Sequence, residues 1–130
     1  MAEHPNATLI RRGYDAFSTA DMATLSELIA PDAVQHMPGH NVFSGDHKGR
    51  DAIFTMYGQL AERSGGTLRV ELEEVYANDD EVVTVYRATG TRDGRNLDTR
   101  HALVFQMRDG KAIDLTDVSS DEKADDEFWG

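Results

Sequence analysis

The segment of residues 97–118 constrains the fold most, because apolar side chains alternate on both sides of one turn signal. Before the turn, every second residue is apolar or aromatic, with Thr99 as the exception. These residues are Leu97, His101, Leu103, Phe105 and Met107. A period of two predicts a β-strand with one face against a core. Ile113 and Leu115 continue the pattern after Asp109 and Gly110, so we predict a β-hairpin.

The length of the turn decides which side chains face each other across this hairpin. A two-residue turn would set Phe105 opposite Asp114, whereas a three-residue turn would set it opposite Ile113. We predict the three-residue turn because it keeps apolar residues opposite apolar ones, and a slip of one residue would reverse a strand's faces. This register places His101 directly opposite Asp117 on the inward face.

Length and composition exclude several classes of protein. The 130 residues predict one domain over residues 1–130. The formal net charge of −11 disfavours binding to nucleic acid or to an anionic membrane. Without cysteine the chain has neither disulfides nor a thiol nucleophile. Because the N-terminus lacks an apolar signal core and no apolar run approaches bilayer length, we expect a cytoplasmic protein.

The order of predicted elements indicates an α+β fold. Asn6 or Thr8 can cap a first helix and Asp21 a second, a short strand covers residues 33–37, and a third helix covers residues 50–63. Four antiparallel strands follow, with a bulge near residues 73–74, and the acidic tail is predicted to be a solvated face with Trp129 docked. We therefore expect one curved, cone-shaped, mixed or antiparallel sheet whose concave face holds three helices from the N-terminal half. Helices cannot fill such a cone completely, so we expect a pocket.

Four strings of the sequence resemble the nuclear transport factor 2-like superfamily and, within it, the SnoaL-like branch. They are YDAFSTADMATLSELIAPDAV, HMPGHNVFSGDHKGRDAI, VFQMRDGKAIDL and DDEFW, and together they span nearly the whole chain. The resemblance implies a cone-shaped α+β barrel with an apolar cavity, a homodimer formed through the outer sheet face, and no metal or organic cofactor. This superfamily holds isomerases, dehydratases, epoxide hydrolases, polyketide cyclases and non-catalytic binders, so the resemblance specifies the fold better than the reaction.

The resemblance also implies roles for particular residues. SnoaL-like cyclases use a carboxylate on the last strand as general acid/base, and Asp117 resembles that residue. They place a histidine one strand over, where this chain has Leu103, and His101 lies two residues earlier on the same face. An acid at the Leu103 position would be needed for ketosteroid isomerase activity, so its absence argues against that reaction. Tyr14 matches a helix position that faces the ligand in some relatives, and the isomerase base would lie near His36.

The residues themselves leave two interpretations of His101 and Asp117. A polar pair on an otherwise apolar face is costly unless it is useful, and a carboxylate beside an imidazole tunes a general base. The alternative is a structural cross-strand pair. His36, on the same side of its strand as Val34, is either a pocket-lining base or a histidine bonded to the turn backbone. The spacing of the histidines near residues 36–47 does not predict a metal site.

From these observations we predict a cofactor-independent enzyme that isomerises, cyclises or dehydrates an apolar, carbonyl-bearing ring compound by proton abstraction. Asp117 would be the acid/base, His101 its orienting partner, and His36 or Tyr14 a donor to the enolate oxygen. The predicted pocket wall comprises Val34, Phe17, Phe54, Tyr57, Tyr86, Leu103, Phe105, Met107, Leu115 and Trp129.

Two alternatives remain open from the sequence. The first is a non-catalytic protein that binds a small apolar ligand in this cavity or serves as a dimer scaffold, with the cavity filled by side chains. The second is a dehydratase that uses two histidines, His36 and His101, and it requires both imidazoles to reach one substrate. The expected partners are a small apolar molecule and a second copy of the chain, with neither nucleic acid nor membrane.

Overall fold

The computed structural model describes residues 3–130 as helices packed on one curved sheet. The elements in this part of the chain are α1 (Pro5–Thr19), α2 (Met22–Leu28), β1 (Ile29–Met37), β2 (Gly45–Lys48), α3 (Arg50–Arg63), β3 (Arg69–Ala77), β4 (Glu81–Arg92), β5 (Arg95–Arg108), β6 (Lys111–Ser119) and α4 (Glu122–Trp129). This order confirms the predicted α+β class and the N-terminal position of three helices.

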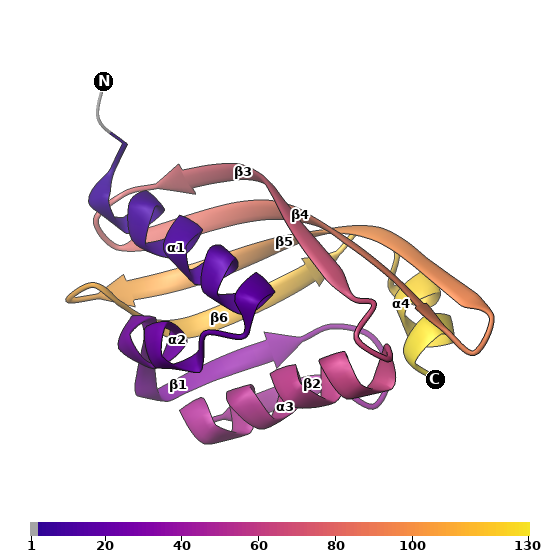
Figure 1. Cartoon of the computed structure of the whole chain (residues 1–130). Helices are drawn as coiled ribbons and strands as arrows, with labels where there is room; N and C mark the ends of the chain where they lie inside the picture. The colour runs from indigo at the N-terminus through magenta and orange to yellow at the C-terminus, as the bar shows by residue number, and fades with distance from the viewer. Residues whose placement is uncertain (1–2) are drawn as a thin grey trace.

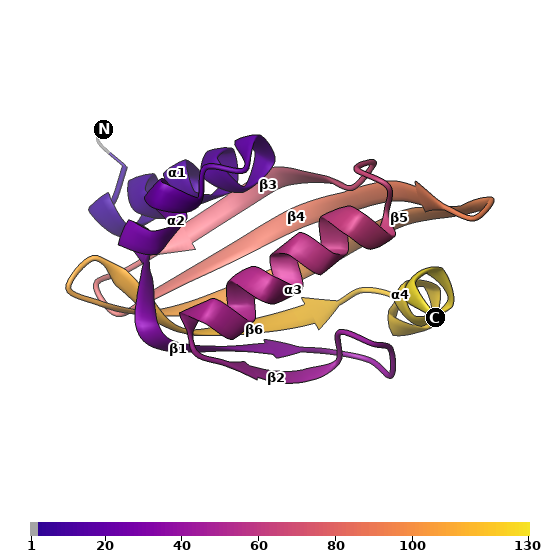
Figure 2. The same ribbon diagram turned by 60° about the horizontal axis from the view of Figure 1, so that its bottom comes forward.

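The strands form a six-stranded sheet with the order β2-β1-β6-β5-β4-β3 in the described residues. Neighbours are antiparallel except β1 and β6, which run parallel, so the sheet is mixed. Both α1 and α3 lie on the same face of the sheet (Figures 1 and 2). The order is open, with β2 and β3 at the edges, so the sheet does not close into the barrel that was expected.

The helices begin and end largely where their sequences predict. Asp21 caps α2 by accepting from the Thr24 amide, and α3 has the predicted bounds. The predicted caps of α1 were wrong: His4 is the N-cap, and Pro5 takes the first helical position, where a missing N–H costs nothing. None of the helices within residues 3–130 is long and apolar enough to cross a membrane.

Two elements were not predicted. The turn-rich loop contains β2, which pairs with β1, and the acidic tail folds into α4. Asp121 caps α4 by accepting from the Ala124 amide, while Arg92 donates to the Phe128 and Gly130 carbonyls at its other end. The predicted docking of the tail is present, but Asp125 is buried with Phe128 and Trp129, so the solvated-face prediction fails for that carboxylate.

The β5–β6 hairpin has a different register from the one predicted. Asp109 and Gly110 form a two-residue turn in which both residues have positive φ, 53° and 76°, and such turns match the twist of paired strands. The register then shifts by one residue, because Ile113 has no partner between the pairs Met107–Ala112 and Gln106–Asp114. This bulge sets apolar residues opposite each other again. The alternation of residues in the sequence did not predict it.

A consequence of the bulge is that Asp117 lies opposite Leu103, and His101 lies opposite Ser119. The predicted direct pairing of His101 with Asp117 was therefore wrong. Their side chains still meet, because diagonal neighbours on one face of an antiparallel pair are within reach of long side chains. His101 Nδ1 lies 2.6 Å from Asp117 Oδ1. The bulge predicted in β3 is confirmed by the register shift between Leu72 and Glu74.

The inward face of β1 was predicted incorrectly. Ala33 and Gln35 are buried, whereas Val34 and His36 are half-buried on the opposite face. In the predicted strand of residues 33–37, polarity is mixed on both faces, so the sequence does not show which face is buried. Packing against α3 decides it.

The hairpin turn gives the first testable prediction. Replacing Gly110 with alanine should destabilise the protein by about 1–2 kcal/mol, because an L-residue is strained at its φ of +76°. The control is Gly58→Ala in α3, where a new Cβ meets nothing within 4 Å and alanine should raise stability by about 0.5–1 kcal/mol. Urea unfolding of both variants measures the two effects. Equal effects would contradict the left-handed turn.

Candidate functional site

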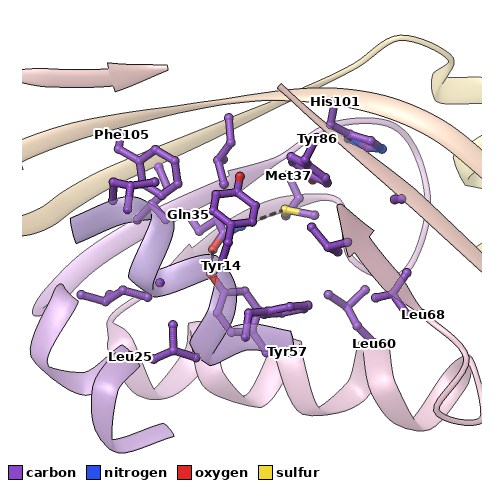
Figure 3. A pocket seen from close by; sticks show the side chains of 18 of the residues that line it. Tyr14, Leu25, Gln35, Met37, Tyr57, Leu60, Leu68, Tyr86, His101 and Phe105 are labelled. Atoms are coloured by element: carbon purple, nitrogen blue, oxygen red, sulfur yellow. Dashed lines mark hydrogen bonds between the residues drawn. The ribbon is translucent and has the colours of Figure 1, made fainter. Parts of the chain in front are cut away.

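A largely apolar cavity lies between the sheet and the helices on its inner face (Figure 3). Its volume is about 140 Å³. An apolar cavity of roughly 150 Å³ holds one benzene molecule, so this one suits a single ring. The polar side chains on its wall are Tyr14, Gln35, Tyr57, Tyr86, His101 and Asp125. A mostly apolar hollow with a few polar groups is typical of a small-molecule site.

The His101 imidazole bonds to groups on three elements. Its Nδ1 lies 2.6 Å from Asp117 Oδ1 on β6, and its Nε2 lies 3.4 Å from Asp125 Oδ2 on α4. Thr99, two residues earlier on β5, places its hydroxyl 3.1 Å from the same Nε2 and donates to Asp125 Oδ1 at 2.9 Å. The Ser119 hydroxyl also donates to Asp125. The site therefore exists only when α4 is docked on the sheet.

Two carboxylates hold a proton on this imidazole. Burial opposes its charged form, yet the bonds to Asp117 and Asp125 outweigh burial and raise the pKa of His101 to about 9. Burial works against ionisation of Asp125 as well, but His101 and Ser119 lower the pKa of that carboxyl below its usual value. At neutral pH the site thus presents an imidazolium beside an ionised carboxylate.

Asp117 is enclosed behind the cavity wall. Its side chain is 0% exposed, and its two oxygens accept from His101 and from the Tyr86 hydroxyl, which lies 2.5 Å from Oδ2. The Tyr86 ring stacks on the imidazole, with centroids 5.1 Å apart and planes 13° apart. Burial, followed by the charge of Asp117, raises the pKa of Tyr86, so its phenol keeps the proton. Asp117 reaches the cavity only through these two rings.

Two further tyrosines bring hydroxyl groups to the wall. The Tyr14 hydroxyl lies 2.7 Å from Thr84 Oγ1, and the Tyr57 hydroxyl donates to Gln35 Oε1 at 2.7 Å. Burial raises the pKa of both phenols, so they are neutral donors at physiological pH. Tyr14 comes from α1 and Tyr57 from α3, so both helices contribute to the polar groups of the cavity.

The structure brings most of the predicted site residues to the wall. Those that line the cavity are Tyr14, Phe17, Tyr57, Tyr86, His101, Leu103, Phe105, Leu115 and Trp129. Asp117 lies behind them, and four others do not line the cavity. Val34 and His36 face outward from β1, Phe54 packs beside Tyr57 on α3, and Met107 lies near the hairpin turn.

His36 belongs to a separate cluster on the outer side of the sheet. Its Nδ1 lies 2.6 Å from Asp46 Oδ1 and its Nε2 2.8 Å from Asp114 Oδ1, and these bonds, with Asp46 first, raise the pKa of His36. The two-histidine dehydratase is therefore not supported, because His36 and His101 lie on opposite faces. In residues 3–130, no group of three His, Cys, Asp or Glu side chains is arranged to hold a metal ion.

Sequence reasoning missed Gln35 and Asp125. No signal identified Gln35, because both faces of β1 carry residues of mixed polarity. Asp125 could have been found: Asp121 is a good helix cap, and Asp125, Phe128 and Trp129 share the spacing i, i+3, i+4 of one helix face. A helix assignment there would have placed a carboxylate among the docked aromatic rings.

The family comparison agrees with this architecture. Residues 10–115 match the family model of the SnoaL-like domain. The uncharacterized protein Rv0034 of Mycobacterium tuberculosis is 34% identical over 130 residues, with 99% of each chain covered.

Solved structures extend the comparison. The chain is 42% identical to Bal32a from a soil-derived mobile gene cassette, with a TM-score of 0.94 and 97% of each chain covered. TerC, crystallized with polyporic acid, is 23% identical, with a TM-score of 0.79 over 90% of this chain and 92% of TerC. The likeness to TerC is one of fold alone.

The site predicts a measurable coupling between α4 and His101. Asp125→Asn should lower the His101 pKa from about 9 by a unit or more, because it removes one of the two anions beside the imidazolium. The matched control is Glu122→Gln, which removes one charge from the exposed side of the same helix. NMR titration of the imidazole, assigned with His101→Gln, measures both. An unchanged pKa in Asp125→Asn would show that the helix carboxylate does not hold the proton.

Proposed function

This chain belongs to the SnoaL-like domain family, and we propose that it is an enzyme performing acid/base chemistry on a neutral, apolar ring compound that bears a carbonyl group. One observation carries the proposal: a partly buried imidazolium and an ionised carboxylate, His101 and Asp125, lie side by side on the wall of a ring-sized apolar cavity. Acid and base groups with displaced pKa values in such a hollow are typical of catalytic sites.

The reaction that this pair supports is enolisation. The Nε2–H of His101 would exchange its contact with Asp125 for the carbonyl oxygen of the substrate and give that oxygen its proton, while Asp125 takes a proton from the neighbouring carbon. The carbonyl oxygen and the neighbouring carbon lie close together in the substrate. His101 Nε2 and Asp125 Oδ2 are likewise close, at 3.4 Å, so the two groups can act on adjacent atoms. The resulting enol can be protonated at another carbon, attack a second carbonyl, or expel a hydroxyl group. These outcomes correspond to isomerisation, aldol cyclisation and dehydration.

Asp117 has a different role from the one predicted for it. Because it is enclosed by His101 and Tyr86, we assign it as a positioning residue that fixes the imidazole ring and favours its charged form. Tyr14 faces the cavity and remains a candidate donor to the substrate. His101 would be the acid that contacts the substrate, so the roles predicted for Asp117 and His101 are exchanged.

Two further facts support small-molecule chemistry over a purely structural role. The aromatic residues Phe105 and Trp129, which a scaffold would use to fill the hollow, stand on its wall and leave it open. TerC, which shares the fold, has been crystallized with polyporic acid.

The proposal predicts catalysed exchange of the α-hydrogens of cyclohexanone in D₂O, measured by NMR. Exchange should slow by about 100-fold or more in His101→Gln and in Asp125→Asn, because each removes one partner of the proton transfer. The wild-type rate should fall above about pH 9, as His101 loses its proton. In Asp117→Asn this fall should begin at lower pH.

His36→Gln provides the control for these variants, since His36 lies on the outer face and should leave the rate unchanged. Thermal melts verify that each variant is folded. If the wild type binds cyclohexanone but exchanges its hydrogens no faster than buffer, the protein is a binder and the catalytic proposal is wrong.

We also propose that two copies of the chain pair through the outer face of the sheet. Apolar side chains face outward across three neighbouring strands, in the cross-strand pairs Val83–Val104, Val85–Ala102 and Ala102–Val118. Val118 is 53% exposed and Tyr76 on β3 is 60% exposed. A solvated sheet face normally carries polar residues at such positions, so an apolar one favours a partner.

This pairing predicts a dimer mass for the wild type in analytical ultracentrifugation. Val118→Lys should shift the protein to monomer, because it places a charge in the apolar contact. Val42→Lys, at an exposed apolar loop residue away from the sheet, should leave the mass unchanged. A monomeric wild type at micromolar concentration would overturn the proposal.

A further inference from the structure

We infer that Gln35 forms a second polar subsite in the cavity, so that the ligand is a neutral ring compound with oxygen atoms on opposite sides. One oxygen would accept from His101 and the other from the Gln35 amide. The inference rests on the proposed function for the cavity and its ligand, and it adds a specificity-determining residue together with a narrower class of substrate.

The amide nitrogen of Gln35 is a hydrogen-bond donor that lacks a strong acceptor within the protein. The side chain is 4% exposed, and its Oε1 accepts from the Tyr57 hydroxyl. Its Nε2 carries two N–H groups, yet its acceptor among residues 3–130 is the thioether sulfur of Met37, at 3.5 Å. A thioether is a weak acceptor, so this contact satisfies a buried N–H group less well than an oxygen atom would. The amide is therefore suited to an acceptor brought by a ligand.

The orientation of the amide follows from its neighbours. Tyr57 donates to the oxygen end, and the pKa of its buried phenol is raised, so it remains a donor. Turning the amide over would place two donors together at Tyr57 and an oxygen against sulfur. Tyr57 thus fixes the nitrogen end toward Met37 and the interior of the cavity.

The two polar subsites lie apart on the sheet. Gln35 of β1 pairs with Leu115 of β6, which pairs with Phe105 of β5, and His101 is four residues from Phe105 on that strand. The backbones are therefore about 10 Å apart across the strands and about 13 Å along them. Both side chains reach into the same hollow, with His101 beside Tyr86 and Gln35 beside Met37 (Figure 3). A single ring between them would turn opposite substituents toward the two subsites.

Charge restricts the ligand further. The imidazolium of His101 already faces two carboxylates, Asp117 and Asp125, so this end of the cavity has no net positive charge to attract an anion. The Gln35 amide is neutral and donates. Carbonyl oxygens of a neutral molecule satisfy both subsites, whereas a carboxylate would meet repulsion at the His101 end.

The test compares two ring ketones of the same size, cyclohexane-1,4-dione and cyclohexanone, by NMR titration of the wild-type protein. We expect the dione to bind about tenfold more tightly, because only the dione has an oxygen for Gln35. In Gln35→Met, which keeps the side-chain length and removes both the donor and the acceptor of the Tyr57 hydroxyl, this preference should disappear. Gln106→Met is the matched control. Gln106 lies on β5 away from the cavity wall and bonds to Glu81, so this variant should keep the preference for the dione.

A second readout does not depend on the variant folding. The side-chain amide protons of Gln35 in the wild type should shift further on addition of the dione than on addition of cyclohexanone, because only the dione accepts a hydrogen bond from them. Equal affinities for the two ketones, or a preference that survives Gln35→Met, would overturn the subsite. Failure of both ketones to bind would overturn it as well.

The exchange measurement separates this inference from the proposed function. If cyclohexanone exchanges its hydrogens in the wild type but the dione gains no affinity, the catalytic proposal stands and the Gln35 subsite is wrong. If the dione is preferred through Gln35 but no exchange is catalysed, the subsite stands and the catalytic proposal is wrong.

Discussion

An imidazolium held between two carboxylates is the interaction on which the rest of this structure depends. A buried charge is costly unless it is paired, and His101 is paired on both nitrogens, by Asp117 and by Asp125. The three residues come from β5, β6 and α4, so the same bonds that keep the proton on His101 also fasten the C-terminal helix to the sheet. Removing Asp125 would therefore change both the chemistry of the site and the docking of the helix, whereas Asp117 contacts His101 and Tyr86 on the sheet.

The cavity beside this group is open because the aromatic side chains around it bond to one another and to the wall. Tyr86 stacks on His101 and donates to Asp117, while Phe128 and Trp129 pack edge to face. Rings held in this way cannot rotate to fill the hollow without losing their partners. The polar atoms of the wall have three roles. Some bond to the imidazole and some bond to the aromatic rings, while the Gln35 amide directs an N–H donor toward the cavity.

The hairpin shows how local patterns can lead to a correct contact through an incorrect register. Alternation correctly placed His101 and Asp117 on one face, and the Asp109–Gly110 signal correctly predicted a turn. The bulge at Ile113 was not visible, because a one-residue insertion in the ladder leaves the apolar pattern of each strand almost unchanged. The contact survived because diagonal neighbours, like direct ones, lie within reach of a histidine and a carboxylate.

The sequence by itself determined the fold class, the bounds of α3, the cap of α2, and the meeting of His101 with Asp117, because caps, turns and alternation are local properties of the chain. Tertiary structure alone decided the inward face of β1, and with it the choice of Gln35 over His36, since both faces of that strand have equal local preference. It also decided that Asp117 is enclosed and that Asp125 joins His101. These outcomes depend on which surfaces are left to cover once the sheet has curved, and no short stretch of sequence contains that information.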